Sequence, residues 1–226
     1  MLEHVFARAY PLVLVALLAA CAAPGATQRA VHYWDVAAIP SAATAVVELP
    51  TRGVQGEPYA ISVQRAQVEQ LRRVAQKLSS DAGLPMPRLF LSDDMQWTGV
   101  AGKDQDGKPA IAVTVRLLHV ADGDEGVLAA TIGHELGHIA LQHVAARSLD
   151  ATQTDVTRFS YRQELEADEY GTRLAKKSGY DLGGLERFFE KMRVANPRLV
   201  YLDGYHPPQE ERIANIRRIA RELEAQ

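Results

Sequence analysis

The chain has 226 residues, enough for one well-buried domain with a terminal extension. Its hydrophobic fraction of 47% and charged fraction of 23% are ordinary for a globular protein. The formal net charge of −3 argues against a general nucleic-acid binder, which usually has an excess of basic residues. The sequence has a single cysteine, Cys21, so it can form no internal disulfide.

The first residues resemble a bacterial secretion signal. The apolar run Leu12–Ala20 is shorter than the ~20 residues that a membrane-spanning helix needs, and it ends in small residues. Leu18-Ala19-Ala20-Cys21 is similar to a lipobox, in which the cysteine is lipidated and becomes the mature N-terminus. We therefore expect a signal peptide over residues 1–20 and a membrane anchor on Cys21. An ordinary cleaved signal and an apolar N-terminal helix are the alternatives.

A tether is expected after the signal. Residues 21–60 are rich in alanine, proline, glycine and threonine and show little periodicity, which predicts a lead-in with some ordered contacts through Tyr33 and Trp34. The folded domain is expected over residues 61–226. Its first element is predicted to be a helix from Ser62, which can cap it, to about Ala82, where a glycine follows.

Two short strands are expected next, over Arg88–Leu91 and Ile111–Val115, because both segments have high β-propensity. Gly99–Gly107 between them reads as a turn-rich loop or the tip of a hairpin. Since the strands lie early and helices outnumber them, we predict a mostly helical α+β domain with a small sheet before the main helix. The later helices are expected over residues 125–147, 162–178 and 182–195, and from Pro207–Pro208 onward.

His134-Glu135-Leu136-Gly137-His138 is an HExxH sequence inside the helix expected over residues 125–147. His134 and His138 are four residues apart, so both imidazoles lie on one helix face and can reach one ion. Zinc is the natural ion for imidazole and carboxylate ligands with one open position. Glu135 is rotated by about 100° from His134. It can therefore act as a general base on a water molecule without binding the metal.

Two glycines, Gly133 and Gly137, lie in the same expected helix. Each costs about 1 kcal/mol relative to alanine in a helix interior. A helix kept only for packing has little reason to carry both. The close approach of a strand or of a substrate backbone would explain them, which argues against a chance HExxH match.

The third metal ligand must come from another element. A metzincin would have glycine at position 141 and histidine at 144, where this chain has leucine and valine. Glu164 lies in the next expected helix, four residues before Asp168, so the two carboxylates share a face. We expect Glu164 to bind the metal, Asp168 to support the ligands without touching the ion, and small Ala167 to allow close helix packing. One alternative is that these acidic residues form a solvated face. Another is that Glu166 is the ligand, although it points to a different face of the helix.

Three segments together resemble a known family. They are HELGH at 134–138, ELEAD at 164–168, and His206-Pro207-Pro208 with Arg212. Over residues 62–221 the chain is similar to the HtpX-like zinc metallopeptidases, which include the CAAX prenyl endopeptidases and the bacterial envelope proteases BepA and LoiP. The resemblance implies a gluzincin-type domain with one zinc ion per chain and Glu164 as the third ligand.

The resemblance also implies roles for two residues near the C-terminus. His206 would lie over the active site, either donating to the transition-state oxyanion or capping the zinc in a resting state. Arg212 would pair with Asp168. Without the resemblance, His206 would be a helix-start residue and Arg212 a surface charge. His143, five residues past His138, lies off its helix face and is interpreted as structural.

One segment departs from the family pattern. The family usually has an Asn-Ala-Phe-like stretch on the strand before the metal helix, where the substrate backbone pairs. This chain has Gln96-Trp97-Thr98-Gly99-Val100-Ala101 there. We expect substrate to add to the edge of this strand by β-augmentation, with different side-chain pockets. Since no membrane-spanning segment is visible after residue 20, the chain is expected to resemble the soluble or lipid-anchored branch of the family.

Three functions follow as hypotheses. The first is a zinc metalloendopeptidase, lipid-anchored on the periplasmic side of the bacterial envelope, at the outer membrane. The resemblance implies misfolded or unassembled envelope proteins as its substrates. The second is a latent, chaperone-like assembly factor whose zinc is capped by His206, and the third is a binding module without metal. Glu135 favours the enzyme, because a structural zinc site has four protein ligands and needs no glutamate there.

Overall fold

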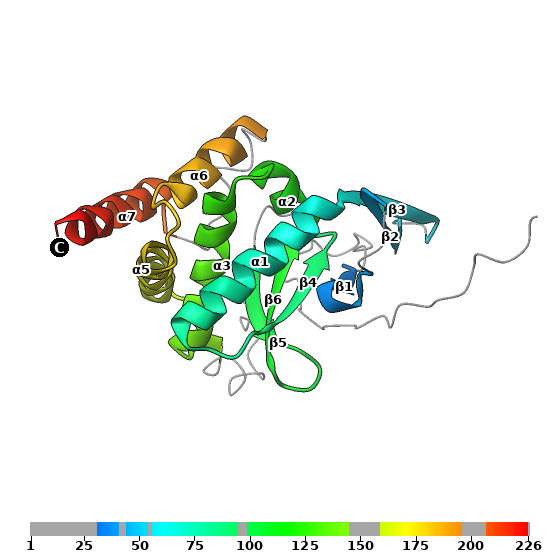
Figure 1. Cartoon of the computed structure of the whole chain (residues 1–226), viewed down its shortest axis with the longest axis horizontal. Helices are drawn as coiled ribbons and strands as arrows, with labels where there is room; N and C mark the ends of the chain where they lie inside the picture. Colours follow the sequence, from blue (N-terminus) through cyan, green and yellow to red (C-terminus); the bar gives the residue numbers. More distant parts are fainter. Residues whose placement is uncertain are drawn as a thin grey trace, which may run out of the picture.

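The computed structural model describes residues 31–40, 44–53, 56–94, 99–144, 159–195 and 207–225. The predicted signal peptide over residues 1–20, Cys21 and His206 lie outside these residues. The described part is a mixed α+β fold rich in helix, with small sheets before the HExxH helix, which confirms the predicted fold class (Figure 1). Within those ranges, each helix is too short or too polar to cross a membrane.

A four-stranded sheet has the order β1-β4-β6-β5. β4 and β6 are parallel to each other, whereas β1 pairs with β4 and β5 pairs with β6 in the antiparallel direction. The order leaves β5 at one edge of the sheet. The segment Gly99–Gly107, predicted as a loop or hairpin tip, begins as strand β5 and becomes a turn only after Lys103. The bounds are Tyr33–Asp35 for β1, Arg88–Ser92 for β4, Gly99–Lys103 for β5 and Pro109–Thr114 for β6.

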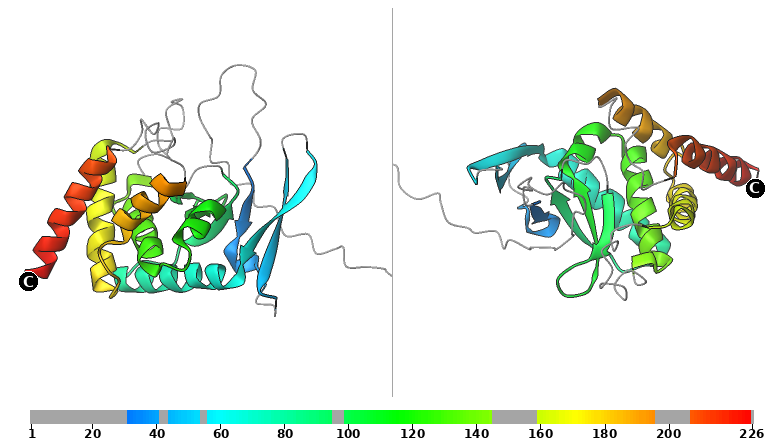
Figure 2. Two further views of the ribbon diagram at one scale, coloured as in Figure 1. Left: turned by 90° about the horizontal axis from the view of Figure 1, so that it is seen from above. Right: turned by 180° about the vertical axis from the view of Figure 1, so that it is seen from behind.

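A second sheet consists of two antiparallel strands, β2 (Val46–Arg52) and β3 (Pro58–Gln64). It lies at the end of the molecule away from the C-terminal helices (Figure 2). Residues 31–60 were predicted to be a tether with a few ordered contacts, but the described part of this segment contains β1, β2 and the start of β3. Trp34 Nε1 donates to the carbonyl oxygen of Pro50 at 3.0 Å, which joins β1 to β2. Only every second residue of β2 is buried, so this segment has too few apolar residues to stand out in the sequence.

Helix α1 spans Arg65–Ala82. The expected start at Ser62 is wrong, because Ser62 belongs to β3. At the actual start, the backbone N–H of Gln64 donates to Gln67 Oε1 at 3.3 Å. The helix ends as expected at Gly83, whose φ of 68° lies in the left-handed region that glycine adopts without strain.

Besides the short 3-10 helix Val36–Ala38, five further helices have both ends within the described part of the chain. α3, α5, α6 and α7 lie where helices were expected, with shifted ends; α3 stops at Ala140, short of the predicted residue 147. α2 was not predicted, because Val115 was assigned to the preceding strand. Thr114 instead caps α2, its Oγ1 accepting from the Leu117 backbone N–H at 3.1 Å. The bounds are Val115–Ala121 for α2, Glu125–Ala140 for α3, Tyr161–Lys177 for α5, Gly184–Ala195 for α6 and Gln209–Glu224 for α7.

α3 is the central helix of the fold. It packs against β5 and β6 on one side and against α5 and α6 on the other, while α7 lies along α5 (Figures 1 and 2). Asp124 caps its N-terminus, accepting from the Val127 backbone N–H at 3.2 Å. Arg187 of α6 donates to both oxygens of Asp124, at 2.8 and 2.9 Å. This arrangement buries the HExxH residues between the edge strand and α5.

Candidate metal centre

Small residues bring α3 and α5 into backbone contact. A Cβ added to Gly133 would lie 3.1 Å from the Gly171 backbone, and a Cβ added to Gly137 would lie 3.0 Å from the Ala167 backbone. The close approach expected at both α3 glycines is therefore made by α5, and not by a strand or a substrate backbone. The expected tight packing of Ala167 is confirmed. Gly171 was missed, although it lies four residues after Ala167 and repeats the spacing of Gly133 and Gly137.

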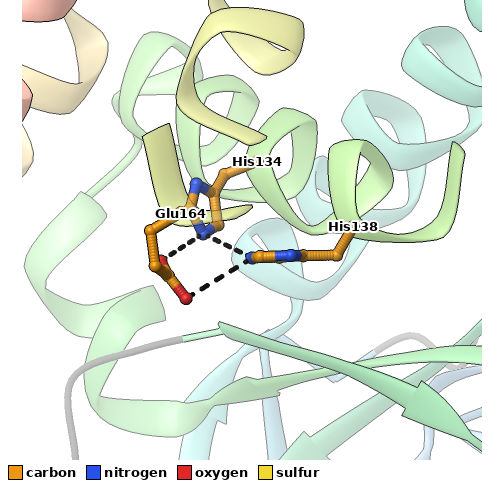
Figure 3. A group of neighbouring side chains, drawn as sticks. All are labelled: His134, His138 and Glu164. Atoms are coloured by element: carbon orange, nitrogen blue, oxygen red, sulfur yellow. Dashed lines mark hydrogen bonds and ion pairs between the residues drawn. The ribbon is translucent and has the colours of Figure 1, made fainter. Parts of the chain in front are cut away.

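The side chains of His134, His138 and Glu164 converge between these two helices (Figure 3). The Nε2 atoms of the two histidines are 3.0 Å apart. The carboxylate oxygens of Glu164 lie 3.2 Å from His134 Nε2 and 3.7 Å from His138 Nε2. All three side chains are buried. Within the described residues, this is the one group of histidine, cysteine or acidic side chains placed to hold a metal ion.

Asp168 and Arg212 lie behind His134. His134 Nδ1 is 2.8 Å from Asp168 Oδ1, and Arg212 donates to both oxygens of Asp168, at 2.6 and 2.7 Å. The expected Asp168–Arg212 pair is thus present and ties α5 to α7. Arg212 also lies 5.2 Å from the centre of the Phe189 ring, a contact that the sequence did not indicate.

The charges around His134 favour a cation at the convergence point. Burial lowers the pKa of His134, but the hydrogen bond and charge of Asp168, together with Glu164, raise that pKa to about 10. Burial likewise opposes ionisation of Asp168, but Arg212 and His134 lower its pKa to about 2. Asp168 is therefore an anion that accepts a hydrogen bond from Nδ1–H of His134. The Nε2 atom faces Glu164, and a metal ion bound there would take the place of the Nε2 proton.

His138 has a different set of neighbours. Its Nδ1 lies 2.9 Å from Nδ1 of His143, and the Phe159 ring stacks on it with centroids 3.6 Å apart and planes 12° from parallel. His143 is not among the converging donors, in agreement with its interpretation as structural. Glu166 is not among them either; it lies 3.4 Å from His143 Nε2 and accepts from Arg162 at 2.8 Å. Burial lowers the pKa of His143, while Glu166 opposes that shift.

Glu135 lies on the side of α3 that faces the edge strand. A Cβ on Gly99 of β5 would be 3.1 Å from Glu135 Cγ and 3.3 Å from Glu135 Oε1, so the strand backbone passes directly over this side chain. The strand expected across Gln96–Ala101 is present from Gly99, and residues 95–98 lie outside the described part. His206, the other expected catalytic residue, also lies outside it.

Comparisons with known proteins all indicate a relationship to peptidases. The family model described as Peptidase family M48 matches residues 65–157 and 146–220. A protease HtpX homolog of Ralstonia nicotianae is 34% identical over 83 residues, which cover 37% of this chain and 28% of that protein. Metalloprotease LoiP of Escherichia coli is 31% identical over 118 residues, covering 39% of this chain and 47% of LoiP. The matched segments thus span less than half the length of these curated relatives.

Proposed function

Because the chain belongs to peptidase family M48, we propose that it is a zinc-dependent metalloendopeptidase of the gluzincin type. Family membership implies a metal, and the cluster of His134, His138 and Glu164 is suited to hold it. The convergence of these three donors beside Glu135 is the observation that carries the proposal. Two imidazoles and one carboxylate, drawn from two helices, leave a coordination position open, as catalytic zinc sites do.

The residues around the site have separate tasks in peptide hydrolysis. Zinc bound there supplies Lewis acidity to the scissile carbonyl and lowers the pKa of water towards ~7. Glu135 accepts a proton from the attacking water and passes it to the nitrogen of the leaving amine. Asp168 and Arg212 hold the His134 ring in place, since ionised Asp168 accepts a hydrogen bond from His134 Nδ1 and a second one from Arg212. His206 is proposed to donate to the developing oxyanion.

An extended polypeptide is the proposed substrate. β5 pairs with β6 on one side and forms an edge of the four-stranded sheet. A substrate strand can add to such an edge through backbone hydrogen bonds, which recognise shape more than sequence. Because Gly99 lies against Glu135, a peptide on this edge would present its scissile bond near the proposed base.

The cellular place is proposed from the N-terminal sequence and the family resemblance. The Leu18–Cys21 segment supports lipidation of Cys21 and anchoring at the periplasmic face of the outer membrane. Misfolded or unassembled envelope proteins are then the substrates within reach. A Cys21→Ala chain should leave the membrane fraction and appear in the periplasmic fraction; unchanged membrane association would contradict the anchor.

The enzymatic proposal is tested by measuring zinc content and casein cleavage for the wild-type chain and for Glu135→Gln. We expect about one zinc per chain in both proteins, with cleavage by the wild type alone. Glu169→Gln, a matched change at a half-buried position of α5, should cleave casein like the wild type. Zinc without wild-type cleavage would instead support a latent, capped assembly factor. A wild-type chain that binds no zinc would refute the metal chemistry.

A further inference from the structure

The two histidines of the HExxH sequence are supported differently. His134 has a buried carboxylate, Asp168, at its Nδ1 atom, whereas His138 has another imidazole, that of His143, at the equivalent atom. His138 is 1% exposed and His143 is 6% exposed, so water does not replace this contact. The contact between His138 and His143 therefore belongs to the buried structure of the site.

The Nδ1–Nδ1 distance of 2.9 Å limits which ring nitrogens of His138 and His143 can carry protons. An N–H···N hydrogen bond needs one protonated and one unprotonated nitrogen. His138 directs Nε2 toward His134 and Glu164, so as a neutral ligand it carries its proton on Nδ1 and donates it to His143. His143 then carries its own proton on Nε2, which faces Glu166 at 3.4 Å.

The backbone before His143 is shaped for this contact. α3 ends at Ala140, and Gln142 has a φ of 59°, a left-handed conformation that residues other than glycine rarely adopt. Such strain persists only where the surroundings compensate for it. The turn brings His143 back to His138, where Phe159 stacks on the His138 ring and lies 6.0 Å from the His143 ring centre.

We propose that His143 and Glu166 are positioning residues that fix the proton and the ring orientation of the metal ligand His138. The chain of contacts runs from His138 through His143 to Glu166, and Arg162 holds Glu166 at its outer end. It links α3 to α5 a second time, through His138 where Asp168 acts through His134. The proposal rests on the proposed function in taking His138 as a ligand.

Zinc affinity of the full-length chain, measured by chelator competition after metal depletion, tests the proposal. His143→Phe keeps a ring but removes both nitrogens, and should weaken zinc binding by roughly 10- to 100-fold. His143→Asn places an amide oxygen near the lost Nδ1, and should recover binding to within about 3-fold of wild type because it restores an acceptor. Glu166→Ala should weaken binding less than His143→Phe does. Glu169→Ala, which removes a similarly exposed partner of an arginine on α5, should have no effect.

Nitrogen-15 NMR of the histidine rings provides a reading that does not depend on activity. We expect His138 to carry its proton on Nδ1 and to show a scalar coupling to His143 Nδ1 across the hydrogen bond. A His138 protonated on Nε2 would overturn the proposal, as would wild-type zinc affinity in a folded His143→Phe chain. If His143→Phe does not fold, the wild-type spectrum decides. If the wild type holds no zinc, the proposed enzymatic function fails, while the metal-free spectrum still tests the contact.

Discussion

Gly171 of α5 faces the backbone of His134 on α3 so closely that a Cβ on Gly171 would lie 2.7 Å from the His134 amide nitrogen. This contact explains how donors from two helices reach one point. The Glu164 side chain is too short to cross a wide gap between α5 and α3. The two helix backbones must therefore nearly touch for its carboxylate to lie 3.2 Å from His134 Nε2. The geometry of the candidate metal centre therefore depends on a residue that carries no side chain.

Gly171→Ala should destabilise the protein and weaken zinc binding together. An unhindered change from glycine to alanine in a helix would stabilise it by about 1 kcal/mol. Here the added methyl group forces the helices apart, and we expect a net loss of roughly 1–3 kcal/mol in unfolding free energy. Urea unfolding and chelator competition measure the two effects. Lys176→Ala, an exposed change on the same helix, is the control, and a Gly171→Ala chain as stable as the wild type would contradict this account.

Arg212→Met should be strongly destabilising, because it leaves a buried carboxylate unpaired. The Asp168 side chain is 0% exposed and the Arg212 side chain 10% exposed. Breaking a buried pair from one side costs about 3–5 kcal/mol. Combining Arg212→Met with Asp168→Asn should recover part of that loss in denaturant unfolding of the metal-free chain, since no unpaired charge remains.

The surface pair between Arg173 and Glu169 provides the comparison for Arg212. Both of these side chains are about 40% exposed. Arg173→Met should therefore cost less than about 1 kcal/mol. Equal losses of unfolding free energy for Arg173→Met and Arg212→Met would show that burial does not increase the cost of breaking the Arg212–Asp168 pair.

Gly99→Ala should lower peptidase activity without changing zinc affinity. The new methyl group would meet the Glu135 side chain at 3.1 Å and displace its carboxylate from the attacking water. Small errors in the position of a general base are costly, and we expect kcat/KM to fall on the order of 10-fold. Lys103→Ala, at the exposed end of β5, should retain activity. Full activity in Gly99→Ala would argue against Glu135 as the base in this position.

Asp124→Asn should change how stability depends on pH. Hydrogen bonds from Arg187 lower the pKa of Asp124 to about 2, against the opposing effect of burial. Since the folded value lies below the unfolded value of about 3.9, the unfolded chain takes up the proton first. The ion pair therefore stabilises the protein above about pH 4, and this contribution is lost as the pH falls towards 2.

The variant should accordingly be less stable than the wild type by about 1 kcal/mol at pH 7, after allowance for partial solvent screening. The difference should shrink between pH 4 and pH 2 in denaturant unfolding. Asparagine keeps the helix cap, so the comparison isolates the charge. Glu190→Gln, at an exposed position of α6, controls for a general loss of negative charge. A difference that stays constant with pH would contradict the prediction.

Several elements could be predicted because their signals are local. The α1 end at Gly83 and the strand at Arg88 follow from turn propensity and β-propensity within a few residues. β2 and α2 were missed for the opposite reason. α2 is only seven residues long. In β2 only every second residue is buried, and one of its contacts, from Trp34 to Pro50, joins residues that are 16 positions apart in the chain. Local patterns carry too little information for such elements.

The candidate ligands and their pairing on helix faces could be predicted from the sequence, because four-residue spacing on a helix places His134 with His138 and Glu164 with Asp168. How these two faces meet, and which neighbours hold each imidazole, follows from the packing of α3 against α5. The backbone contact at Gly171 and the contact of His143 with His138 depend on chain reversals and helix packing that no local spacing encodes. Side-chain identity follows from the sequence, whereas the distances between side chains on different helices are set by packing of the whole core.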